Sequence, residues 1–100
     1  MSTYVFIKSS ESVYHILRGD YMFIPTLDSV IVGKVIADFR KKKGVSQEVL
    51  SGFADIGRTH LSAIERGERK PTLETLYRIA NALEVKMSDI VIEIENRTAK

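Results

Sequence analysis

Residues 46–67 read SQEVLSGFADIGRTHLSAIERG, and this stretch decides the fold. Ser46 can begin a first helix, because a serine hydroxyl accepts a hydrogen bond from the free backbone N–H groups of a first turn. The apolar side chains that follow recur at helical spacing: Val49, Leu50 and Phe53. Residues 55–57 are few and polar at their ends, which predicts a tight turn, with Gly57 as the next N-cap.

A second short helix is predicted after this turn. Leu61 and Ile64 give it a buried side, and Gly67 can end it in a left-handed conformation. The side chains left facing outward near its start are Arg58, Thr59, Ser62 and Ala63. Such side chains suit the edges of bases, since arginine reads guanine, hydroxyls have several partners and alanine contacts the thymine methyl. We therefore predict that these four residues contact DNA bases.

The segments that carry a family resemblance are Ser46-Gln47-Glu48, Ala54, Ile56, Arg58-Thr59, Leu61-Ser62, Ile64-Glu65-Arg66-Gly67 and Pro71-Thr72-Leu73. Together they resemble the Cro/CI (Xre-type) helix-turn-helix family, over roughly Val32 to Val91. The resemblance implies a mainly α, five-helix lambda-repressor-like domain that binds double-stranded DNA and regulates transcription. Asp55 stands where the family usually has glycine, and Gly57 replaces the usual serine or aspartate cap.

Polar side chains around the two helices are predicted to contact DNA phosphates: Ser46, Gln47, His60, Arg66, Arg69 and Lys70. For Gln47 and Arg66 this role is implied by the resemblance. For the basic run at 40–43 the sequence leaves two interpretations open, a solvated helix end or a phosphate contact.

Charge and composition favour the same function. Residues 29–70 carry nine basic and five acidic side chains, a net charge of +4, between two ends of net charge −1. Such a basic middle suits a DNA-binding face. There is no cysteine, His15 and His60 share no ligand spacing, and no catalytic constellation is visible, so we expect no metal, no cofactor and no enzyme. Glu65 is expected to pair with a nearby basic side chain. We expect no secretory signal, no run approaches the roughly 18 apolar residues of a membrane helix, and the expected compartment is the cytoplasm.

Three regions are predicted along the chain. Residues 1–28 form an N-terminal extension with a short strand and a helix, which packs on the domain or on a partner. Residues 29–91 form the DNA-binding domain; it starts with a helix capped by Asp28 or Ser29, has a fourth helix after Thr72 and ends with a short helix capped by Ser88. The fourth helix is expected to be buried through Leu73, Leu76, Ile79, Ala80 and Leu83. Residues 92–100 form a C-terminal strand or tail, because isoleucine and glutamate alternate there.

The apolar ends of the chain predict a homodimer. The side chains assigned to its interface are Tyr4, Phe6, Ile90, Ile92 and Ile94, which exceed what a small core should hold. Two other functions remain open at this point. One is the antitoxin of a toxin–antitoxin pair that autoregulates its promoter, and the other is a protein-interaction adaptor that has lost DNA binding.

Overall fold

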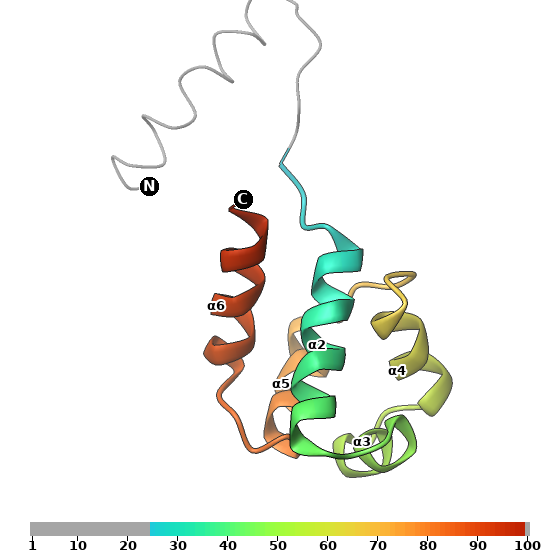
Figure 1. The fold of residues 1–100 in the computed structure, drawn as a ribbon. Helices are drawn as coiled ribbons and strands as arrows, with labels where there is room; N and C mark the ends of the chain where they lie inside the picture. Colours follow the sequence, from blue (N-terminus) through green and yellow to red (C-terminus); the bar gives the residue numbers. More distant parts are fainter. Residues whose placement is uncertain (1–24, 100) are drawn as a thin grey trace, which may run out of the picture.

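The computed structural model describes residues 25–99, in which five helices pack around one shared core (Figure 1). The helices are α2 (Ser29–Lys43), α3 (Gln47–Ala54), α4 (Arg58–Glu65), α5 (Leu73–Ala82) and α6 (Met87–Thr98). This confirms the mainly α, five-helix fold. The strand and helix predicted within residues 1–24, with the interface residues Tyr4 and Phe6, lie outside the described residues.

Side-chain caps set the starts of three helices. Asp28 Oδ1 accepts from the N–H of Val30 at 2.8 Å, and Ser46 Oγ accepts from the N–H of Val49 at 3.0 Å. Thr72 Oγ1 accepts from the N–H of Thr75 at 3.0 Å, so the caps predicted for α2, α3 and α5 are confirmed. Gly57 occupies the N-cap of α4 without a side chain to contribute.

Residues in the left-handed backbone conformation follow the ends of α2, α3 and α4. Gly44 follows α2 at φ 81°, and Gly67 follows α4 at φ 79°. Asp55 ends α3 at φ 56° and ψ 49°, so an aspartate adopts the left-handed conformation for which the family usually has glycine. The chain thereby turns from α3 into α4 within Asp55, Ile56 and Gly57, as the sequence predicts.

Helix α2 lies at the centre of the fold and packs against both α4 and α6, while α5 packs against α3 and α6 (Figure 1). One core joins all five helices, and its fully buried side chains are Val35, Ile36, Leu50, Leu61, Ile64, Ile79 and Ile90. Leu61 and Ile64 fix the inner side of α4 in this core. The outer side of the same helix is therefore held in a defined orientation.

The C-terminal strand predicted from the alternation of isoleucine and glutamate is wrong, because α6 runs without a break from Met87 to Thr98. Ile90 and Ile94 are one helical turn apart and both are buried in the core, whereas Ile92 is 53% exposed. Residues four positions apart lie on the same face in a helix and also in a strand, so this spacing fits both. The packing of Ile90 and Ile94 into the core favours the helix. The predicted cap is also wrong: α6 starts after Lys86, whose N–H donates to Asp89 at 3.1 Å, and Ser88 lies inside the helix.

One predicted core residue of α5 is on the surface. Leu73 is the first residue of the helix and is 70% exposed, while Leu76, Ile79, Ala80 and Leu83 are buried as predicted. On α3, Leu50 is buried but Val49 is exposed and Phe53 is 73% exposed. An eight-residue helix on a small core can bury only a narrow stripe, so the apolar neighbours of that stripe remain on the surface.

Candidate nucleic-acid interface

The outer side of α4 carries most of the side chains predicted to read bases. Arg58 and Thr59 are exposed in its first turn, and Ser62 is half-buried one turn later. Ala63 is only 9% exposed, so the prediction that it faces outward with the other three is wrong. The structure therefore brings Arg58, Thr59 and Ser62 together as the accessible polar surface of this helix.

A half-buried ion pair fixes α4 to α2. Arg40 on α2 donates to Glu65 at the end of α4 through two nitrogens, with Nε–Oε2 at 2.7 Å and Nη2–Oε1 at 3.0 Å. The Arg40 and Glu65 side chains are 12% and 6% exposed. A fork of two parallel hydrogen bonds is the strongest geometry for such a pair, and this bonding raises the pKa of Arg40 above its usual value.

The same carboxylate also holds Gln47. The Gln47 side-chain amide donates to Glu65 Oε1 at 2.9 Å, and Arg40 Nη1 donates to the carbonyl oxygen of Val45 at 2.9 Å. One network thus connects α2, α3 and α4 and sets the position of the first residue of α3. The prediction that Glu65 pairs with a basic side chain is confirmed. Arg40, by contrast, is half-buried and all three of its guanidinium nitrogens donate within this network, so it is not the solvated helix end considered for its run.

Backbone contact brings α2 and α4 even closer together at Gly33. A Cβ atom built on Gly33 would lie 2.3 Å from the carbonyl oxygen of Ile64 and 2.7 Å from that of Glu65. Only a residue without a side chain fits between these helices. The close approach and the Arg40–Glu65 pair act on the same end of α4.

A basic groove runs beside this network. Its volume is about 640 Å³, and it is lined by Lys34, Ala37, Asp38, Arg40, Lys41, Gln47, Glu65, Arg66 and Arg97. Lys34 and Lys41 are exposed, and neither forms an ion pair with a described residue. Their spacing of seven residues places them on one face of α2, and this spacing is a signal in the sequence that could have identified them. Both are well placed to contact a phosphate beside Gln47.

The other side chains predicted to contact phosphates differ in their burial and in whether they already form hydrogen bonds within the protein. Ser46 Oγ already caps α3, and His60 is half-buried. Arg66 is bound by Glu68, with Nε–Oε2 at 2.7 Å and Nη2–Oε1 at 3.0 Å. In the loop after α4, Arg69 is exposed, and Lys70 Nζ donates to Thr26 Oγ1 at 3.0 Å.

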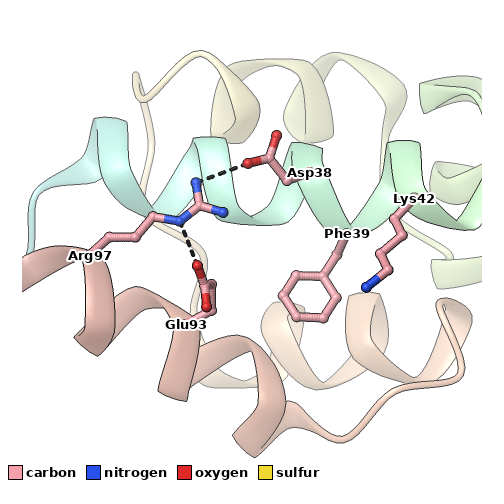
Figure 2. Close-up of a pocket in the computed structure, with 5 residues that line it drawn as sticks. All are labelled: Asp38, Phe39, Lys42, Glu93 and Arg97. Carbon is pink, nitrogen blue, oxygen red and sulfur yellow. Dashed lines mark hydrogen bonds and ion pairs between the residues drawn. The ribbon is translucent and has the colours of Figure 1, made fainter.

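A second, smaller groove separates α2 from α6, on the side shown in Figure 2. Its volume is about 270 Å³, and it is lined by Asp38, Phe39, Lys42, Glu93 and Arg97. Arg97 reaches from α6 between two carboxylates, at 2.9 Å from Asp38 Oδ2 and 2.9 Å from Glu93 Oε2. The hydrogen bonds to these two carboxylates raise the pKa of Arg97, and the bond to Glu93 has the larger effect. This cluster fastens α6 to α2.

Residues 25–99 contain no group of three or more histidine, cysteine or acidic side chains that could hold a metal ion. Nor is any of the described helices long and apolar enough to cross a membrane.

The chain belongs to the helix-turn-helix family of the Cro/CI type, a family of DNA-binding transcriptional regulators, and the family match covers residues 36–90. It is 39% identical over 61 residues to the uncharacterised HTH-type transcriptional regulator y4dJ of Sinorhizobium fredii, covering 61% of this chain and 79% of that protein.

Two further similarities agree with this membership. The chain is 39% identical over 62 residues to the immunity repressor protein of Bacillus phage phi105, covering 62% of this chain but only 43% of that repressor. Among solved structures, the restriction-modification controller protein C.AhdI from Aeromonas hydrophila superimposes with a TM-score of 0.62 at 29% identity, covering 65% of this chain and 98% of that one.

Proposed function

We propose that the protein represses transcription by binding, as a homodimer, to a palindromic operator in double-stranded DNA. The observation that carries this proposal is the arrangement of α4, whose exposed side presents Arg58, Thr59 and Ser62 while Glu65 locks its other end to α2 and α3. A helix held in this way can enter the major groove as a rigid reader. Occupancy of the operator would then exclude other proteins from the promoter.

The residues divide into two roles. Arg58 is the best candidate to read guanine, since its guanidinium can donate to O6 and N7 together, and Thr59 and Ser62 lie on the same side of α4. Gln47, Lys34 and Lys41 line one groove and would position the protein on the phosphate backbone, which carries affinity without sequence information.

Replacement of Arg58 by alanine is expected to weaken operator binding by about 1–3 kcal/mol and to relax preference at one base pair in each half-site. Arg58→Lys is the matched control, because lysine keeps the positive charge but lacks the planar pair of N–H donors. This variant should lose the base preference and still bind unrelated DNA nearly as well as the parent. Selection from a random DNA library measures both effects. Unchanged base preferences for Arg58→Ala would remove Arg58 from the base-reading role.

Dimerisation follows from the limited reach of one short helix. Two copies of α4 about 34 Å apart would read two half-sites one helical turn apart. Ile90 and Ile94 are buried in the subunit's own core, so the prediction that they lie in the dimer interface is wrong. Of the three isoleucines assigned to that interface, only Ile92 is exposed. The other large apolar side chains exposed on α5 and α6 are Leu73, Tyr77 and Val91. We propose that these two helices form the subunit interface.

Ile92→Glu and Tyr77→Glu are each expected to produce a monomer that keeps its helical circular dichroism and binds the operator far more weakly. A charge within such an interface loses its hydration without compensation, while each large apolar side chain buried there contributes about 1.5–3 kcal/mol. Phe53→Glu serves as the control. Phe53 is even more exposed than Ile92 and Tyr77 but lies on α3, outside the proposed interface, so this variant should stay dimeric. Analytical ultracentrifugation tests the proposal, and a parent protein that is monomeric at tens of micromolar contradicts it.

A further inference from the structure

Arg66, at the end of α4, uses three of its five guanidinium N–H groups in hydrogen bonds to side chains of its own chain. Two of its guanidinium nitrogens donate to the carboxylate of Glu68, at 2.7 and 3.0 Å, and the third donates to the hydroxyl of Ser62. Arg66 and Glu68 are exposed, and Ser62 is half-buried. The side chain that the resemblance assigns to a DNA phosphate is therefore already occupied.

The backbone places Glu68 where it can do this. After α4, Gly67 adopts φ 79°, the N–H of Gly67 donates to the carbonyl of Ile64 at 3.0 Å, and the N–H of Glu68 donates to that of Ala63 at 2.9 Å. This pair of bonds is the Schellman arrangement that ends a helix and turns the next residue back along it. A Cβ on Gly67 would lie 2.9 Å from the Cα of Val30, so the packing of α2 holds the turn in place.

The contact between Glu68 and Arg66 has the geometry of an arginine–phosphate contact. Carboxylate and phosphate both offer two oxygens to the planar fork of a guanidinium. The hydrogen bonds from Arg66 also lower the pKa of Glu68, whose carboxylate is charged at neutral pH in any case. For a phosphate to bind the same Nε and Nη2 fork of Arg66, Glu68 must first be displaced and would then face the negative DNA backbone.

We propose that Glu68 is a built-in competitor for the DNA phosphate at Arg66, which lowers the protein's affinity for all sequences alike. This inference rests on the proposed DNA-binding function and adds a residue that sets its strength. It predicts that Arg66 contributes no net counterion release in the parent protein, because the displaced Glu68 carboxylate takes up a cation in place of the one that leaves the phosphate. Ser62 takes part as well, since its hydroxyl oxygen accepts from Arg66 and keeps its own O–H to donate to a base.

The test is the salt dependence of binding to a fixed duplex of unrelated sequence. Glu68→Gln should steepen the slope of log K against log salt by about 0.9, the value for one additional phosphate contact, and so increase the ratio of affinities at 50 and 200 mM salt about 3.5-fold. Arg66→Ala should leave the slope of the parent protein unchanged, and in the Glu68→Gln background it should remove the added 0.9.

A matched control separates this effect from a mere change of net charge. Glu84→Gln also removes a carboxylate bound to a basic side chain, Lys43, but at the turn between α5 and α6, and should leave the slope unchanged. Circular dichroism checks that each variant keeps its helices. The competitor role is overturned if Glu68→Gln leaves the slope unchanged or if Arg66→Ala flattens it in the parent. A parent protein that binds no duplex even at low salt would instead overturn the proposed function.

Discussion

Gly33→Ala is expected to destabilise the protein by at least about 3 kcal/mol, a large part of the 5–15 kcal/mol that stabilises an ordinary domain. The added methyl group would lie 2.3 Å from the carbonyl oxygen of Ile64 and 2.7 Å from that of Glu65. These are backbone atoms of α4, so no side chain can rotate to make room. Relief requires α2 and α4 to separate, which would also strain the Arg40–Glu65 pair.

Gly52→Ala is the matched control, because the same change on α3 meets nothing within 4 Å. There the helix propensity of alanine should increase stability by about 0.8–1 kcal/mol. Chemical denaturation of the two variants measures the difference. If Gly33→Ala were as stable as the parent, the close approach of α2 to α4 would be wrong. A variant that folds with reduced stability should also bind its operator more weakly, since α4 is displaced.

The local features of the fold could be predicted from the sequence because they depend on single residues. Ser46 and Thr72 each stand directly before a helical apolar pattern and cap α3 and α5, and Gly44 and Gly67 follow the ends of α2 and α4. The turn at 55–57 depends on three consecutive residues. In each case the physical cause lies within one or two turns of the chain.

What could not be predicted depends on contacts between distant residues. The isoleucines at 90, 92 and 94 fit a strand as well as a helix, and only packing against α2 and α5 decides between them. Leu73 fits an apolar stripe but lies at the edge of the core, where it is exposed. Arg40 and Glu65 are 25 residues apart, so the sequence indicated that Glu65 needs a basic partner but could not identify it among several.

In the candidate interface, too, the local features could be predicted from the sequence and the features that depend on neighbouring side chains could not. The outward position of Arg58, Thr59 and Ser62 follows from the helical period once Leu61 and Ile64 are buried. Ala63 shares that side by sequence but is covered, and Arg66 is occupied by Glu68. Which side chains are available to DNA therefore depends on neighbours that periodicity does not reveal.

Glu65→Gln is expected to destabilise the protein by about 2–3 kcal/mol and to abolish tight operator binding. Breaking a buried pair leaves an uncompensated charge, here the Arg40 guanidinium at 12% exposure, which typically costs about 3–5 kcal/mol. We place this pair below that range because it borders the basic groove. The change also replaces the charged acceptor of Gln47 by a neutral amide oxygen, which weakens the hydrogen bond that anchors the start of α3 at the edge proposed to face the DNA backbone.

The exposed pair Arg78–Glu74, at 3.4 Å on α5, provides the control, and Glu74→Gln should change stability by less than about 0.5 kcal/mol. A double variant separates stability from binding. Replacing both Arg40 and Glu65 by methionine leaves no unpaired charge, so stability should recover to near that of the parent. Operator affinity should stay low, because Gln47 still lacks its acceptor. If the double variant regains both stability and affinity, the network only supports the fold; if it regains stability alone, Glu65 positions Gln47 for DNA.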